Sequence, residues 1–151
     1  MGFLEGFLIG GLVGGTIGVV AWILVASRMK GRSVTSVRLP RWTSAQVLQA
    51  AGAYFAQQGM VTQMIPDGVL GRSGSEWVTT AKVLEVRPRD RDGGADVRLD
   101  AYLRALYPKE MNIDPKAILL MFPRRKAFQL AQGLLASVGV SRASWQHYRA
   151  R

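Results

Sequence analysis

The first thirty residues constrain the fold of this chain more than any other stretch. From Phe7 to Ser27 no side chain carries a charge. At about 1.5 Å per residue, this run would span roughly 31 Å as a helix, close to the thickness of a bilayer's hydrocarbon core. Because lipid offers the backbone no hydrogen bonds, a segment of this kind must be helical to pair its own amides. We therefore expect residues 1–30 to form a single N-terminal transmembrane anchor helix.

Glycines recur every four residues along this segment. A four-residue step turns about 400° on an α-helix, so the glycines lie along one slowly winding groove. A groove without side chains lets another helix approach closely, and van der Waals packing can then drive association in lipid. The alternative is a glycine-rich helix whose groove faces lipid. We predict that this face docks a neighbouring helix through Gly6, Gly10, Gly11, Gly14, Gly15 and Gly18.

A cleaved secretory signal is another interpretation of the N-terminal segment. Signals of that class begin with basic residues, whereas this chain begins Met-Gly-Phe-Leu-Glu, with an acid and no base. The myristoylation pattern requires Ser or Thr where this chain has Gly6. We therefore expect an uncleaved anchor.

The net charge of +10 is concentrated on the flanks of the expected domain. Residues 28–42 carry five bases and no acid, and residues 141–151 carry three arginines, while residues 43–140 are nearly balanced. Bases that follow a membrane helix are retained on the cytoplasmic side. We predict a membrane protein of the bacterial inner-membrane type, with its N-terminus outside and its C-terminal domain in the cytoplasm. Nucleic-acid binding is not expected, because a binding face would make the domain itself basic.

The basic residues after the anchor have two interpretations. Each base near an anionic leaflet contributes about 1 kcal/mol of attraction to lipid headgroups. We interpret residues 31–42 as a basic juxtamembrane linker, and we predict that Arg28, Lys30 and Arg32 contact headgroups or a partner. A basic stop signal with no further role explains the same residues.

Residues 43–140 predict one small α+β domain, because about 120 residues are enough for one core and too few for two. Thr43 and Gln46 form a capping box at the start of a helix, and Gly59 stands where a helix would end. The strand patterns that follow predict a mostly antiparallel sheet of three or four strands. The expected strands cover residues 61–65, 69–71, 77–86 and 97–103, and the helices that pack on them cover residues 43–58 and 124–138.

The last predicted hairpin carries opposed charges on its two strands. Lys82, Glu85 and Arg87 would face Arg98, Asp100 and Arg104 on the solvent side of the sheet. Exposed pairs of this kind contribute little to stability and imply no site.

The C-terminal third of the sequence leaves alternative secondary structures open. Residues 116–122 suit either a helix or a buried strand. If a helix begins at Pro123, three cations occupy its positive end, which the helix dipole disfavours. Either the helix begins earlier, near Asp114, and is kinked at Pro123, or Arg124, Arg125 and Lys126 contact lipid headgroups or an acidic partner. Residues 141–151 are expected to form a loosely ordered basic tail.

The residue types present limit the chemistry of the chain. It contains no cysteine and a single histidine, His147, which lies in the expected tail, so the usual zinc sites are excluded and a Ser/His/Asp triad is not expected. We therefore predict no catalytic residues, no cofactor and no metal site. The expected function is that of a non-catalytic accessory subunit packed against other transmembrane subunits of a respiratory, photosynthetic, transport or secretion complex. The alternative is a self-associating, membrane-anchored adaptor whose domain binds a soluble ligand or peptide.

Overall fold

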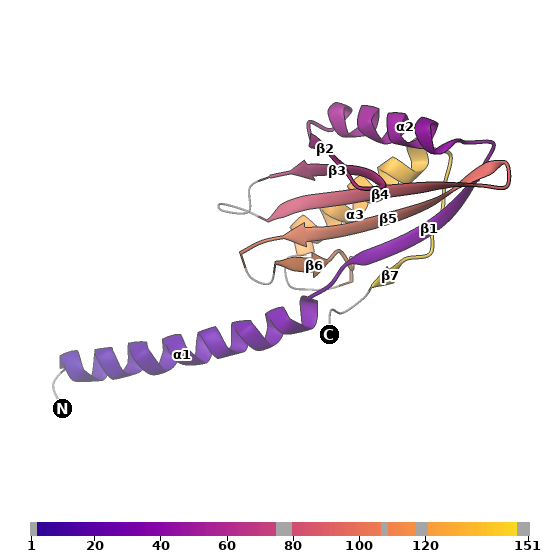
Figure 1. Ribbon diagram of the computed structural model, residues 1–151. Coiled ribbons are helices and arrows are strands. Elements are labelled where there is room, and N and C mark those ends of the chain that lie inside the picture. Colours follow the sequence, from indigo (N-terminus) through magenta and orange to yellow (C-terminus); the bar gives the residue numbers. More distant parts are fainter. Residues whose placement is uncertain (1–2, 75–79, 107–108, 117–120, 148–151) are drawn as a thin grey trace.

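The computed structural model describes residues 3–74, 80–106, 109–116 and 121–147, and within the first helix it describes the side chains of residues 11, 14–25, 27 and 29. One long helix is followed by a domain in which helices and strands are mixed (Figure 1). The elements are α1 (Phe3–Met29), β1 (Ser33–Pro40), α2 (Ser44–Gln57), β2 (Val61–Ile65), β3 (Gly68–Ser73), β4 (Ala81–Arg91), β5 (Gly94–Arg104), β6 (Glu110–Asn112), α3 (Met121–Ser137) and β7 (Gln146–His147).

The strands form one antiparallel sheet in the order β2-β3-β4-β5-β1-β7, with β6 paired to the end of β5. The predicted α+β domain with an antiparallel sheet is confirmed. The predicted number of strands is wrong, because the described residues form a sheet of seven. The additional strands are formed by segments whose pairing partners lie far away in the sequence.

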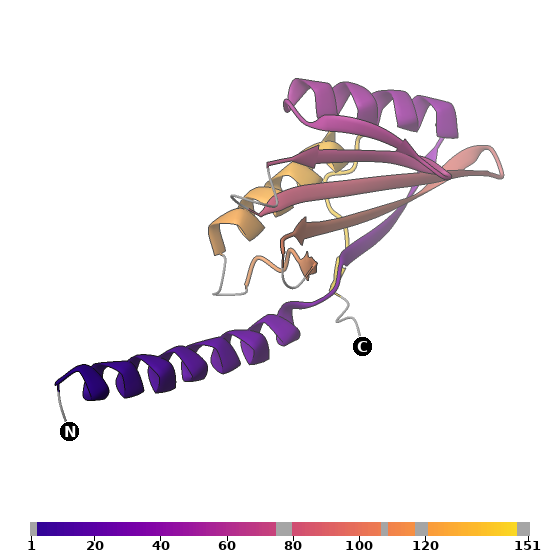
Figure 2. The same cartoon turned by 60° about the vertical axis from the view of Figure 1, so that its left-hand side comes forward.

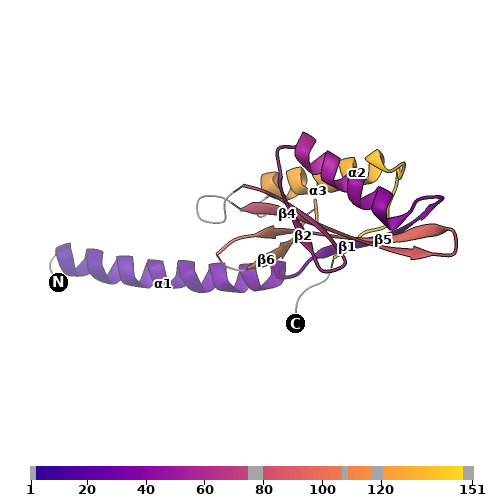
Figure 3. The same ribbon diagram turned by 45° about the horizontal axis from the view of Figure 1, so that its top comes forward.

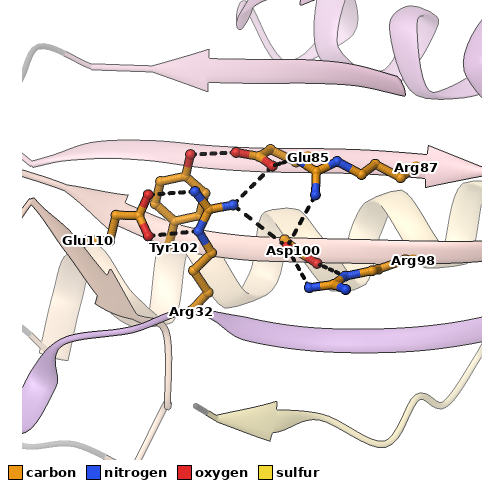
Figure 4. A network of polar contacts seen from close by, with 7 residues as sticks. All are labelled: Arg32, Glu85, Arg87, Arg98, Asp100, Tyr102 and Glu110. Carbon is orange, nitrogen blue, oxygen red and sulfur yellow. Dashed lines mark hydrogen bonds and ion pairs between the residues drawn. The ribbon is translucent and has the colours of Figure 1, made fainter. Parts of the chain in front are cut away.

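Helices α2 and α3 pack on the same face of this sheet (Figures 1 and 3). Alternate residues of β5 point toward them, and Val97, Leu99 and Leu103 are almost completely buried there. Phe55 of α2 is fully buried in the same core. The opposite face is covered by no helix among the described residues, and it carries Arg98, Asp100, Tyr102 and their neighbours (Figure 4).

The basic linker predicted for residues 31–42 is wrong, since residues 33–40 form β1 in the interior of the sheet. β1 pairs with β5 from Ser33 opposite Ala101 to Pro40 opposite Gly94. Its inward-facing positions include small polar residues, which hid the strand pattern. Ser33 Oγ accepts a hydrogen bond from the Ile113 amide at 3.0 Å, and Thr35 Oγ1 donates one to the Ser144 carbonyl at 2.6 Å.

The loosely ordered tail predicted for residues 141–151 is also wrong over its described part. Residues 141–147 return to the sheet, where β7 pairs with the start of β1. The indole of Trp145 packs on Phe128 of α3, with ring centroids 5.7 Å apart. The aromatic residues of the C-terminal segment therefore complete the sheet edge and its core.

Both predicted domain helices are present. Thr43 caps α2 with the expected box, in which its hydroxyl accepts from the Gln46 amide and the Gln46 side chain accepts from the Thr43 amide. α3 begins at Met121, so Pro123 lies in the first turn, where the missing amide hydrogen breaks no helical bond. The open choice for residues 116–122 is resolved as helix for residues 121 and 122, while residues 117–120 lie outside the described part.

Helix α1 projects from the sheet as a single rod of 27 residues. Figures 1 and 2 show it leaving the domain beside β6 and away from the β4–β5 hairpin. Within the part of the chain that the structure describes, no helix is both long enough and apolar enough to cross a membrane.

Candidate functional site: the α1 junction and the charged sheet face

The junction between α1 and the sheet is short and fixed on both sides. Met29, the last residue of α1, is 6% exposed and belongs to the domain core. Asn112 Nδ2 donates a hydrogen bond to the Met29 carbonyl at 3.3 Å, which satisfies one acceptor at the helix end. Lys30 then forms a β-bridge with Met111, and the Gly31 amide donates to the Glu110 carbonyl at 3.1 Å. The last turn of α1 is therefore anchored to β6 and the core.

The glycine face of α1 is open along its described length. A Cβ atom added at Gly11, Gly14, Gly15 or Gly18 would meet nothing within 4 Å. Large apolar side chains elsewhere on the helix are exposed as well, among them Ile17 and Leu24 at 63% and 61%. Of the predicted docking glycines, Gly6 and Gly10 lie on the helix, but their surroundings are outside the described part. Nothing described in this chain occupies the groove.

Arg32 is the centre of a polar network on the helix-free face of the sheet (Figure 4). Its Nη1 lies 3.0 Å from Glu85 Oε2 and 3.7 Å from Asp100 Oδ2, and its Nε donates to Glu110 Oε2 at 2.7 Å. The guanidinium also stacks over the ring of Tyr102, with its central carbon 4.2 Å from the centroid. One side chain thus joins β1, β4, β5 and β6.

The two central carboxylates are nearly inaccessible to water. Glu85 and Asp100 are 5% and 2% exposed, and they face each other across β4 and β5. Glu85 accepts hydrogen bonds from Tyr102 Oη at 2.6 Å and from Arg87 Nη2 at 2.7 Å. Asp100 accepts from Arg98 Nε at 2.7 Å. The predicted exposed pairs of this hairpin are therefore a buried network, because arginine side chains cover the carboxylates.

The network includes three guanidiniums and three carboxylates, so its charges balance. Hydrogen bonds from Arg32 lower the pKa of Glu110, and the same contact raises the pKa of Arg32. Burial, followed by the hydrogen bond to Glu85, raises the pKa of Tyr102 well above its ordinary value. Tyr102 therefore keeps its proton and serves as a donor. The arrangement fixes four strands to one another and leaves its charges mutually paired.

The lowered pKa of Glu110 predicts a pH dependence of stability. Because folding favours the carboxylate, the Arg32 contact stabilises the fold above the ordinary pKa of 4.5 and is lost as the pH falls through the lower folded value. Glu110→Gln should therefore reduce the urea midpoint at neutral pH, and the difference from wild type should shrink as the pH falls below the ordinary pKa of 4.5. A difference that stays constant as the pH is lowered from 7 to well below 4.5 would contradict the assignment.

A depression of about 720 Å³ continues from this network toward the β4–β5 hairpin. Arg38 and Arg91 each lie 3.8 Å from Asp96, so these ion pairs neutralise part of the positive charge of the depression. Arg89 is exposed and makes no ion pair with any described residue. Outside the network, the lining holds Arg38, Arg89 and Arg91 against Asp90 and Asp96, a net charge of +1. The charged residues that line the depression are Arg38, Arg87, Arg89, Asp90, Arg91, Asp96 and Arg98.

The predicted headgroup contacts have different positions in the structure. Arg32 pairs with the carboxylates of the network and its side chain is 28% exposed, so its contact with headgroups or a partner stays a prediction. Arg124 is 1% exposed, and its Nε and Nη2 are buried with no hydrogen-bond partner among the described residues, so it offers no surface contact. Arg125 and Lys126 are exposed on α3. Lys30 is half-buried at the junction, and the side chain of Arg28 lies outside the described part.

The sequence did not reveal the place of Arg32 in the network or the exposure of two apolar residues. Arg32 was hidden because its partners lie on strands 53 or more positions away, and β1 was not recognised. Leu106 and Phe122 are 64% and 79% exposed near the ends of β5 and α3. No set of three or more His, Asp or Glu side chains is placed to hold a metal ion among the described residues. Neither models of protein families nor curated protein sequences yield a match to this chain.

Proposed function

We propose that this chain is a non-catalytic, single-pass accessory subunit of a larger membrane complex, with α1 in the bilayer and the α+β domain in the cytoplasm. The charge-free run from Phe7 to Ser27 supports the assignment of α1 to the bilayer. The structure describes only some of the side chains in this run. The bases that follow the run support the orientation. Respiratory, photosynthetic, transport and secretion complexes all fit this description.

The observation that carries the proposal is the direct joining of α1 to the sheet. A membrane tether needs only a flexible connection, whereas here Met29 is packed in the core and Asn112 caps the helix end. A neighbouring helix that packs on the open glycine face would therefore also fix the position of the domain. This combination suits a subunit that contacts its partner twice, through α1 in the bilayer and through the domain beside the membrane.

The domain would meet the cytoplasmic part of its partner through the helix-free sheet face. The arginine-lined depression beside the β4–β5 hairpin retains positive charge, so it favours an acidic surface. The buried network beneath it keeps this face rigid. Neither feature requires the chain to bind a cofactor or to transfer a proton.

One observation favours the alternative of a self-associating adaptor. β2 forms one edge of the sheet among the described strands, and its Val61 and Met64 are 65% and 69% exposed. An edge strand with free backbone groups can add a strand from a peptide or a second copy. In that case the partner would bind at β2, and the glycine face would hold an identical helix.

Gly14→Leu combined with Gly18→Leu tests the proposal. Two leucines would fill the groove and prevent close helix contact, because both glycines face open space and lie one turn apart. We expect the variant to remain in the membrane fraction but to retain about tenfold less of its co-extracted subunits, which corresponds to roughly 1.4 kcal/mol. The measurement is quantitative mass spectrometry of the complex after mild extraction.

Val20→Phe combined with Ile23→Phe is the matched control. These two residues lie on the side of α1 away from Gly14 and Gly18, and both are exposed. Added bulk there should leave the complex intact. If the leucine variant keeps its partners as well as this control does, the glycine face is not the docking surface.

A further inference from the structure

The end of the domain nearest α1 carries two exposed apolar side chains within a basic surround. Phe122 and Leu106 are 79% and 64% exposed, whereas residues of their size are usually covered. Between residues 104–116 and 121–126 there are six bases and two acids, and one of the acids, Glu110, is paired with Arg32. The exposed members of this group are Arg104, Leu106, Lys109, Lys116, Phe122, Arg125 and Lys126, here called the α1-side surface.

Independent contacts place these residues at one end of the domain. Arg104, at the end of β5, pairs with Glu110 of β6 and with Ala81 at the start of β4. α3 packs on β4 and β5, and after burial the nearby Lys126 ammonium at its start lowers the pKa of Lys82, which lies at this same end of β4. Lys30 at the end of α1 bridges to Met111 of β6. Figures 1, 2 and 3 show α1, β6 and the start of α3 together, opposite the β4–β5 hairpin.

From this placement we infer that the α1-side surface rests on the membrane, with Phe122 and Leu106 inserted among anionic lipid headgroups. The inference rests on the proposed function, because α1 must first be in the bilayer. The junction then matters, since a helix anchored to the core presents the same end of the domain to the lipid. Aromatic and aliphatic side chains suit the apolar edge of the interface, and the surrounding ammonium and guanidinium groups suit lipid phosphates.

The alternative surface for apolar contact lies elsewhere. Val61 and Met64 are as exposed as Leu106, but β2 is the sheet edge farthest from β1 and therefore from α1. Strand β2 also contains no charged residue. Among the described residues, Arg72 of β3, opposite Val61, is the one base paired across to it, fewer than the bases around Leu106 and Phe122.

Single labels can test this contact because the chain contains no cysteine. Phe122→Cys, Met64→Cys and Val20→Cys are each labelled with an environment-sensitive fluorophore in the full chain and reconstituted into vesicles. The vesicles contain phosphatidylcholine alone or phosphatidylcholine mixed with phosphatidylglycerol. We expect a water-soluble quencher to lose access to the labels at positions 20 and 122 and to keep full access at position 64. Protection at position 122 should increase with the anionic lipid and decrease at high salt.

Each other outcome has a separate meaning. Protection at position 20 with full quenching at 122 would overturn the membrane contact and leave the proposed function standing. Equal protection at 122 and 64 would also overturn it, because the domain would have no preferred end. Quenching at position 20 in both vesicles would overturn the proposed function itself and this inference with it.

Discussion

Arg32→Met should lower the free energy of unfolding by about 2–4 kcal/mol, the largest loss expected from a substitution on the sheet face. The methionine would remove the Arg32 contact of Glu110 and one of the two cations, Arg32 and Arg87, that bridge Glu85 and Asp100. Those two carboxylates are almost fully buried, so water cannot replace the lost contacts. The measurement is urea unfolding of the full chain in detergent, followed by tryptophan fluorescence.

Two variants separate the role of the network from that of net charge. Arg89→Met removes the same charge from the same face, but Arg89 is exposed, so its loss should change stability by less than about 0.5 kcal/mol. Arg32→Lys keeps the charge but loses the planar guanidinium that bridges several carboxylates. Its loss of stability should therefore lie between those of Arg32→Met and Arg89→Met. Equal effects of Arg32→Met and Arg89→Met would show that the buried network does not stabilise the sheet.

Arg124→Met should raise the free energy of unfolding of the domain by about 1–3 kcal/mol, the opposite effect to that of Arg32→Met. Arg124 is 1% exposed, and within the described part of the chain its Nε and Nη2 have no hydrogen-bond partner. Burial lowers its pKa, with Asp114 opposing the shift, and it lies in the first turns of α3, where the helix dipole also disfavours a cation. Methionine has a similar length and would fill the same space without a charge.

Arg125→Met provides the comparison for this prediction. Arg125 is the next residue on α3 and is exposed, so removing its charge should change the unfolding midpoint very little. If Arg124→Met is clearly less stable than wild type while Arg125→Met is unchanged, then Arg124 is stabilised in the fold by a contact beyond those described.

Local signals predicted the elements whose structure depends on neighbouring residues. The capping box of Thr43 and Gln46 and the terminal Gly59, which has φ +65°, located α2 to within about a residue at each end. The Pro66-Asp67-Gly68 turn placed the β2–β3 hairpin, and Asp67 adopts the positive φ of 61° that such a turn needs. These features are specified within a few residues, so one sequence is enough to find them.

The candidate site could not be predicted in the same way because its contacts are distant in sequence. Ser33 and Thr35 made residues 31–40 look like a linker, yet each is satisfied by a partner 80 or more positions away. Without β1 in the sheet, Arg32 had no reason to face Glu85. Burial of Glu85 and Asp100 then appeared only when several arginines were brought over them by the fold.

The docking of a neighbouring helix on the glycine repeat stays a prediction from the sequence. The structure places the repeat on a helix joined directly to the domain, with an open surface at Gly11, Gly14, Gly15 and Gly18. The docking of a neighbour on that surface is a property of an assembly, which a single chain does not contain.

The mass of the particle that contains this chain after gentle extraction into native lipid discs tests the central claim most directly. The chain alone has a mass of 16.5 kDa. An accessory subunit predicts a larger particle in which the chain is accompanied by different transmembrane subunits at a fixed ratio. A particle that holds only one copy of this chain would contradict the account, and one that holds only several copies would favour the self-associating adaptor instead.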